Sequence, residues 1–146
     1  MPPNGEVTFI SSILQKLQDA KELCDHGVQA LYLVDKSFFD ESRRNLDFAI
    51  HDGRRMLLKH ADFQALDKLL KKLDSLSRKG GMPPSLEKLS AECRACNDAL
   101  KKIFGDGMSD VPLRIEDMYP AADSCRRTSK LIAKIIRDAF GKGESD

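Results

Sequence analysis

The sequence predicts an all-α protein, a compact bundle of about five helices within one domain spanning residues 1–146. Three observations favour this fold. Apolar residues recur three and four positions apart along most of the chain, which is the spacing of a single buried helix face. The connections between these segments are short, with one exception, and no stretch is a convincing strand. A length of 146 residues with 41% apolar side chains suits one ordinary core.

The first helix is predicted from an apolar stripe that begins at Phe9 and continues for about six turns to Leu31. Residues 1–5 should fray before it. Asp25-His26-Gly27 is a typical stop signal within the stripe, so we expect a bend or break there. Residues 28–34 would then form a short separate piece.

The second helix is predicted to have Ser37 or Asp40 as its N-terminal cap. Its apolar stripe covers residues 46–57 and it should end near residues 59–61. Gly53 lies within this stripe, where it either admits a neighbouring helix closely or weakens the helix.

The centre of the chain is predicted to be a helical hairpin, whose two apolar stripes the other elements must cover. Asp62 should cap a leucine-striped helix that ends at Arg78, with a carboxylate at its positive N-terminus. A Gly-Gly-Met-Pro-Pro turn follows, in which the prolines prevent the helix from continuing. Ser85 should cap the next helix, which ends at Phe104.

One long irregular segment is predicted at residues 105–119. It is acidic, yet it is too apolar for a free linker, so it should lie against the bundle or serve in binding. Pro120 is placed to start the last helix at its favoured first position. That helix should reach Phe140, with residues 142–146 as a frayed tail.

Charge is distributed unevenly along a chain whose formal net charge is +1. Residues 54–104 carry twelve Lys or Arg against six Asp or Glu, a surplus of +6, whereas residues 105–125 carry one against five, a balance of −4. A basic middle favours an acidic partner, although solvated helix faces give the same pattern. Nucleic acid is not the expected partner, because the net charge is small and the chain has no Trp and two Tyr for base stacking.

The four cysteines allow three interpretations. A disulfide framework belongs to short secreted chains, and the opening residues lack a basic start followed by an apolar block. Cys93 and Cys96 form a CxxC pair that could bind zinc together with Cys24 and Cys125, but no second CxxC follows. All four fall on apolar helix stripes, so we expect reduced core thiols, no metal and no cofactor.

Enzyme motifs are missing from the sequence. It contains no GxGxxG, GxxxxGK[ST], HExxH or GxSxG pattern, and none of its three histidines is arranged with a nucleophile. No apolar run approaches the ~20 residues that span a membrane. We therefore expect an intracellular, soluble protein that is not an enzyme, has no catalytic residues and takes no small-molecule substrate.

Surface recognition is then the favoured kind of function. If the central helices pack antiparallel, residues 59–63 and residues 101–104 lie at the same end of the bundle. Phe63 and Phe104 would line an apolar notch there, which suits a disordered peptide with an aromatic anchor and flanking acids. Ordinary core packing of both phenylalanines is the alternative. The basic rim of the notch would consist of His60, Lys101 and Lys102.

Three segments together resemble a known family: LLKHADFQALDKLLKKLDSL, PPSLEKLSAECRACNDALKKIF and RRTSKLIAKIIRDAF. They are similar to the N-terminal domain of transcription elongation factor S-II, a five-helix module that also occurs in chromatin-tethering proteins as an integrase-binding domain. The matching features are a leucine-striped helix, the Leu-Lys-Lys helix end and a basic final helix. The chain departs from the family at Cys93-Arg94, where Ile-Gly is usual, in lacking the tryptophan of the last helix, and in residues 1–34, which lie outside the similarity.

The resemblance implies a nuclear scaffold of transcription elongation that binds short disordered motifs of transcription or chromatin proteins, typically an aromatic pair among acidic residues. It implies that Asp62 accepts hydrogen bonds from backbone amides of the ligand and that both phenylalanines line the pocket. The implied partner-binding residues are His60, Asp62, Phe63, Lys101, Lys102 and Phe104.

A second resemblance gives a different function. The segment DKSFFDESRRNLDFAIHDGRRML is similar to the four-helix PsbQ-like lumenal proteins, which implies an extrinsic structural subunit docked on a photosynthetic membrane complex. A generic bundle that pairs with itself is the third interpretation.

Overall fold

The computed structural model describes residues 4–80, 82–105 and 113–141, and these ranges form helices without a strand. Two 3-10 turns, η1 (Glu41–Arg43) and η2 (Ile115–Asp117), precede α2 and α5, and a π-helical turn, η3 (Arg137–Gly141), extends α5. The prediction of an all-α bundle of about five helices is confirmed. The five helices are α1 (Asn4–Phe38), α2 (Leu46–His60), α3 (Ala65–Arg78), α4 (Pro84–Phe104) and α5 (Met118–Ile136).

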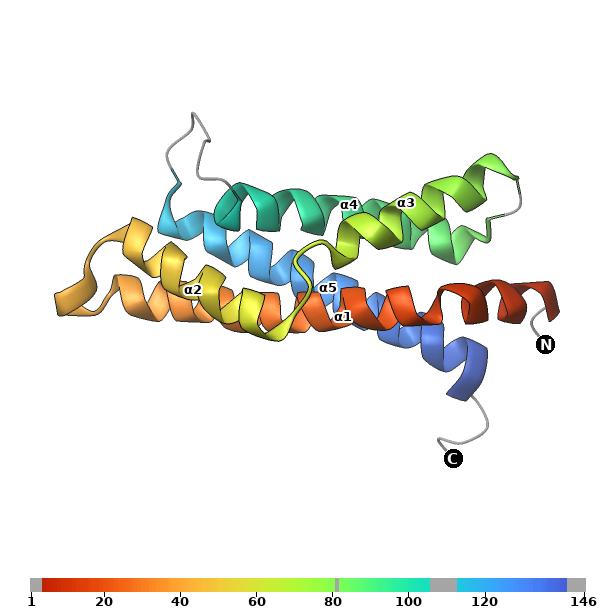
Figure 1. Ribbon diagram of the computed structural model, residues 1–146, viewed down its shortest axis with the longest axis horizontal. Helices are drawn as coiled ribbons and strands as arrows, with labels where there is room; N and C mark the ends of the chain where they lie inside the picture. The colour runs from red at the N-terminus through yellow and green to blue at the C-terminus, as the bar shows by residue number, and fades with distance from the viewer. Residues whose placement is uncertain (1–3, 81, 106–112, 142–146) are drawn as a thin grey trace.

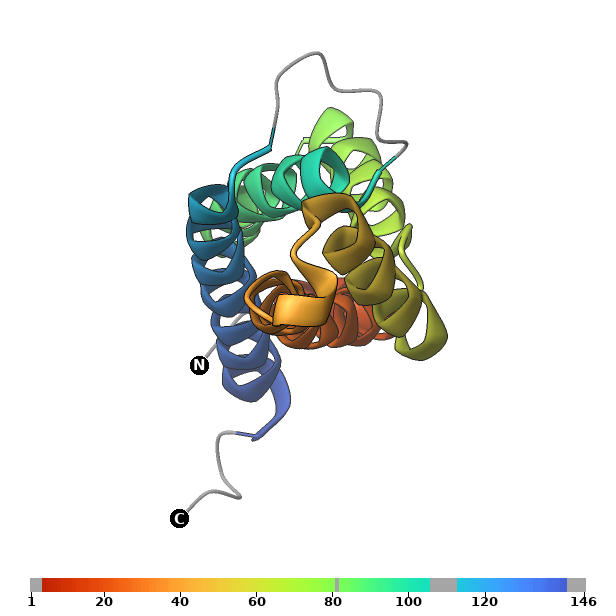
Figure 2. The ribbon, with the colours of Figure 1, turned by 90° about the vertical axis from the view of Figure 1, so that its left-hand side faces the viewer.

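α2 and α3 pack one after the other along α1, so the two helices together form a single rod of the bundle (Figure 1). α1 has 35 residues, which makes it about 50 Å long, and it extends along the whole bundle. α4 packs beside both α2 and α3, and α5 packs against α1 and α4 (Figure 2). Counting α2 and α3 as one rod, successive rods run in opposite directions, as in an up-and-down helical bundle.

The core is built from the predicted apolar stripes. Full burial of each large aliphatic side chain contributes about 1.5–3 kcal/mol, so the stripes of α3 and α4 hold the central hairpin together. The fully buried leucines of the hairpin include Leu66, Leu69, Leu73, Leu86 and Leu89.

None of the described helices has both the length and the apolarity needed to cross a bilayer.

α1 is one continuous helix, and the predicted break at Gly27 is wrong. Gly27 is buried, and a Cβ atom placed on it would lie 3.3 Å from Cys125 Sγ and 3.3 Å from Leu100 Cδ2. The glycine therefore lets α4 and α5 approach α1 closely, and this packing offsets its weak helix propensity. Residues 28–34 belong to α1 and are not a separate piece.

The start of α2 is capped by Asn45, which the sequence analysis missed. The side-chain oxygen of Asn45 accepts hydrogen bonds from the backbone N–H groups of Asp47, at 2.9 Å, and Phe48, at 3.4 Å. Neither predicted cap serves α2: Ser37 lies inside α1, and Asp40 caps η1.

The starts of α3 and α4 lie close to their predicted places. The N-cap of α3 is Gln64, which makes no side-chain cap hydrogen bond, so the prediction that Asp62 caps this helix is wrong. Asp62 Oδ1 instead accepts a hydrogen bond from the backbone N–H of Gln64 at 2.9 Å, in the turn that leads into α3. Gly80 has a φ of 69°, as expected for the glycine just past a helix end. α4 begins at Pro84, so Ser85 lies inside the helix and the prediction that it caps α4 is wrong.

The segment predicted to be irregular, residues 105–119, is partly helical. η2 and the start of α5 lie within it, so Pro120 is in the first turn of α5 but not at its first position. Leu113 and Ile115 pack against the core, as expected of a segment that lies against the bundle. Residues 106–112 lie outside the described residues, as do residues 1–3 and 142–146 of the predicted frayed ends, whereas residues 4–5 belong to α1.

Candidate functional site

The α2–α3 junction holds three of the predicted partner-binding residues. His60 and Asp62 are exposed, and Phe63 is half-buried against the core. The His60 ring stacks on the ring of His26 in α1, with centroids 5.2 Å apart, which holds the junction against α1. Lys68 Nζ lies 2.6 Å from Asp62 Oδ2, and the hydrogen bond that it donates lowers the pKa of Asp62.

The three predicted residues at the end of α4 point in different directions. The ammonium of Lys101 donates to the carboxylate of Asp67 in the first turn of α3 and lowers the pKa of Asp67. Lys102 instead lines a hollow between α4 and α5. Phe104 is 0% exposed, and its Cε1 would lie 3.1 Å from a Cβ atom on Gly53. A partner cannot reach this ring, because the core of the protein itself surrounds it.

In residues 54–104, a larger share of the acidic residues than of the basic residues forms ion pairs. Four of the six acids in residues 54–104 form ion pairs, and three of the twelve cations do so with them. Counting contacts between described residues, nine cations and two acids of this stretch are left without an ion pair within 4 Å. The surplus of positive charge is therefore available to a partner. Among these nine cations are Lys59, Lys71, Lys72, Arg78, Lys79, Lys88 and Lys102.

A hollow of about 540 Å³ lies between the second half of α1 and the start of α5. Tyr32 and Tyr119 flank it and are 58% and 55% exposed. The hydroxyl of Tyr119 donates to Asp35 at 3.1 Å, and Arg126 donates to the hydroxyl of Tyr32 at 2.7 Å while lying over its ring. Sequence reasoning missed this groove because it combines residues from opposite ends of the chain. Its apolar lining includes Leu31, Met118, Pro120 and Ala122.

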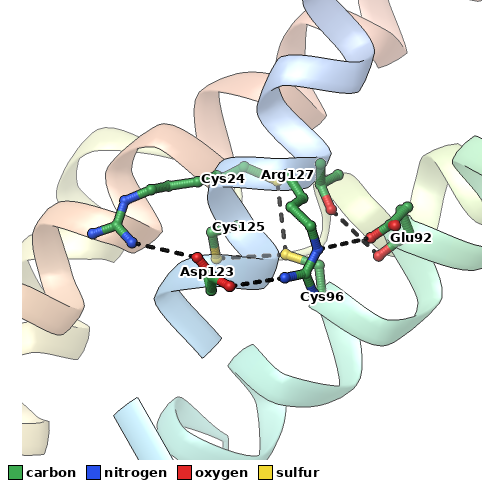
Figure 3. Close-up of polar contacts among 8 residues, drawn as sticks. Cys24, Glu92, Cys96, Asp123, Cys125 and Arg127 are labelled. Carbon is green, nitrogen blue, oxygen red and sulfur yellow. Dashed lines mark hydrogen bonds and ion pairs between the residues drawn. The ribbon is translucent and has the colours of Figure 1, made fainter. Parts of the chain in front are cut away.

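Three thiols meet where α1, α4 and α5 pack together (Figure 3). Cys96 Sγ lies 3.8 Å from Cys24 Sγ and 3.5 Å from Cys125 Sγ, and all three side chains are fully buried. The remaining cysteine, Cys93, is buried as well, and its burial raises its pKa to about 12. The prediction that the cysteines are core thiols is confirmed by this burial. In the described ranges, no three His, Cys, Asp or Glu side chains are grouped so as to hold a metal ion.

Cys96 differs electrostatically from its two neighbours because it lies between them. The sulfur–sulfur hydrogen bonds that join Cys96 to Cys125 and Cys24 lower the pKa of Cys96, and burial opposes them. The nearby hydroxyls of Thr128 and Ser124 act in the same direction as the sulfur contacts, although the Thr128 hydroxyl donates to the carbonyl oxygen of Glu92 at 3.3 Å. The hydrogen bond to Cys96 raises the pKa of Cys24 and of Cys125, and burial raises both further. Of the three thiols, Cys96 is the one whose pKa these contacts lower.

No known protein-family model, curated protein or solved structure matches this chain. The likeness to the elongation-factor module and the likeness to PsbQ-like proteins therefore stay predictions. One architecture serves many functions, so the function has to be inferred from the charges, apolar surfaces and thiols of this chain.

An ion pair crosses the seam between α4 and α5 on which the thiol cluster lies (Figure 3). The guanidinium of Arg127 lies 2.9 Å from Asp123 Oδ2 on its own helix and 3.7 Å from Glu92 Oε2 on α4. Arg127 is 56% exposed, so this bridge adds little stability, but it marks the place where the seam reaches the surface.

Proposed function

We propose that the protein is a non-enzymatic interaction module that binds short acidic segments of protein partners on the exposed surface of α2 and α3. The observation that supports this is the charge imbalance of residues 54–104, where nine cations and two acids have no ion pair with another described residue. An acidic segment is attracted by such a surface from a distance, which speeds its association and makes its affinity sensitive to salt.

The α2–α3 junction would provide the apolar contact. Leu58 is 48% exposed and Phe63 is half-buried, so an aromatic side chain of the partner can pack there while its acids pair with Lys59 and Lys71. Asp62 already accepts hydrogen bonds from Gln64 and Lys68 within the chain. In this proposal Asp62 shapes the junction and is not a free acceptor for the backbone of the ligand.

The likeness to the elongation-factor module gives the proposed partners an identity: disordered acidic and aromatic motifs of nuclear transcription or chromatin proteins. The PsbQ-like alternative would instead have the bundle dock on a membrane complex. A soluble acidic peptide distinguishes the two, because the first proposal requires that such a peptide bind by itself.

Titration of the isotope-labelled protein with a peptide of Asp, Glu and Phe residues tests the proposal. We expect backbone amide shifts in residues 58–72 and an affinity that falls as salt is added. The double variant Lys59→Glu, Lys71→Glu should weaken binding by about 10-fold, since charge reversal at two positions removes attraction and adds repulsion.

The matched control is Lys79→Glu, Lys88→Glu, which makes the same charge change just past the end of α3 and near the start of α4. The turn that joins these two helices lies at the opposite end of α3 from the α2–α3 junction (Figure 1). It should retain most of the affinity. Equal losses in both double variants would show general attraction without a site. Shifts confined to the groove beside Tyr32 and Tyr119 would refute the proposed location.

A further inference from the structure

We propose that Cys96 and Cys125 form a peroxide-sensitive dithiol, whose oxidation to a disulfide joins α4 to α5. The two sulfur atoms are already 3.5 Å apart and hydrogen-bonded, and they approach each other from two neighbouring helices (Figure 3). A disulfide needs the sulfur atoms at about 2 Å, so a shift of about 1.5 Å, shared between two side chains, brings them into bonding distance.

A second feature of the site is an unused donor. Ser124 is 5% exposed, and its Oγ atom has no hydrogen-bond partner among the described residues. A buried hydroxyl without a partner is costly, and it is satisfied if Cys96 becomes a thiolate that accepts a hydrogen bond from it. The hydroxyl of Thr128 is also near Cys96, but it donates to the carbonyl oxygen of Glu92 at 3.3 Å, so Ser124 is the better-placed donor. The surroundings of Cys96 are therefore suited to the charged form, which is the nucleophilic form of cysteine.

A route for a small oxidant lies beside the cluster. A hollow of about 320 Å³ between α4 and α5 is lined by Ala95 and Ser124, the residues directly before Cys96 and Cys125. Hydrogen peroxide is scarcely larger than water, so it fits the hollow and needs a small opening of the seam to reach the sulfur. None of the four cysteines is among the residues that line the hollow, so the oxidant must pass between the helices to reach any of them. Cys93 differs from Cys96 in that it makes no sulfur contact with another cysteine in the described part of the chain.

The reaction balances with hydrogen peroxide as the oxidant. The Cys96 thiolate attacks one peroxide oxygen, the O–O bond breaks, and the released hydroxide takes up a proton to leave as water. Cys96 is then a sulfenic acid. The sulfur of Cys125 attacks the sulfur of Cys96, the S–O bond breaks, and the oxygen leaves as a second water with the Cys125 proton. Two thiols lose two electrons in total, and peroxide gains them.

The chain is convenient for a direct test, because trypsin places each cysteine on its own peptide. We would treat the folded protein with hydrogen peroxide, quench, denature, alkylate the free thiols and map the peptides without reduction. The expected product is a linked pair of residues 95–101 and 115–126, with the other two cysteine peptides alkylated. The four peptides are residues 22–36, 89–94, 95–101 and 115–126.

Variants separate this site from general thiol oxidation. Cys93→Ala should form the linked pair in the parental yield, whereas Cys125→Ala should lose it and accumulate sulfenic or sulfinic acid at Cys96. Far-ultraviolet circular dichroism checks that both variants are folded. Cys24→Ala should keep the crosslink, although Cys24 lies 3.8 Å from Cys96.

Three results would overturn the proposal. One is full alkylation of Cys96 at peroxide doses that oxidise the methionines. Another is a Cys24–Cys96 link in place of the expected one, and the third is random pairing of all four cysteines in the folded protein.

Discussion

Gly53→Ala tests how closely α2 packs on α1 and on the end of α4. A Cβ atom at this position would lie 2.5 Å from Val34 Cγ2, 2.9 Å from the Ala30 carbonyl oxygen and 3.1 Å from Phe104 Cε1. Val34 and Phe104 can turn slightly, but the Ala30 oxygen belongs to the backbone of a long helix. The two helices must therefore move apart, which disturbs the packing of both.

The magnitude follows from two opposing effects. Overpacking a dense core typically costs about 1–3 kcal/mol, and alanine gains about 1 kcal/mol over glycine in helix propensity. Because the contacts at Gly53 are among the shortest that a Cβ could make, we expect a net loss of about 1–2 kcal/mol. This corresponds to a melting temperature lower by roughly 3–6 °C for a chain of this size.

Urea unfolding followed by circular dichroism measures the effect, with an unchanged m-value as the sign that the native state is preserved. Gly27→Ala is the matched control: its Cβ would meet side-chain ends of Cys125 and Leu100 at 3.3 Å, which can yield. Its propensity gain should leave stability within about 1 kcal/mol of the parent. A Gly53→Ala protein as stable as the parent, or more stable, would refute the close packing.

Three further predictions concern stability. Phe104→Ala should cost about 3–5 kcal/mol because it empties a core site, and Phe63→Ala about 1–2 kcal/mol because its ring is half-buried; urea unfolding measures both. Asn45→Ala should cost about 1 kcal/mol in the same assay through loss of the α2 cap. The pKa of Asp67 is lowered from 3.8, so its contribution is present above that pH and is lost as pH falls through the folded pKa. Lys101→Gln should therefore make stability less dependent on pH in this acid range, measured as urea midpoints across pH; an unchanged slope would contradict the pairing with Asp67.

The helices themselves were predictable because apolar spacing reports burial directly. The stripes of α3 and α4 and the ends of both helices at Arg78 and Phe104 were predicted correctly, since each end is marked by cations and glycine. Gly27 was misinterpreted because local propensity disfavours glycine in a helix, whereas the close packing of α4 and α5 on α1 keeps the helix continuous at that point.

Features that join distant parts of the chain could not be found from sequence. The Tyr32–Tyr119 groove forms only because α5 packs beside α1. The contact of Cys96 with Cys125 depends on which face α4 and α5 turn toward each other. Apolar stripes locate a cysteine in the core without saying which other side chain it meets. The sequence therefore predicted buried thiols but not the cluster that they form.

The predicted notch differs from the structure for a reason set by helix geometry. Neighbouring side chains on an α-helix point about 100° apart, so a short motif such as Lys-Lys-Ile-Phe cannot present all its members on one surface. In α4, Lys101 faces α3, Lys102 faces the hollow beside α5, and Phe104 enters the core against α2. Each of the three helices beside α4 thus meets a different residue of the motif.

A partner that binds the α2–α3 junction can therefore contact the Lys101 side of α4 without touching the seam that holds Cys96 and Cys125. Oxidation of this cysteine pair should for that reason leave the affinity of the peptide for the junction unchanged.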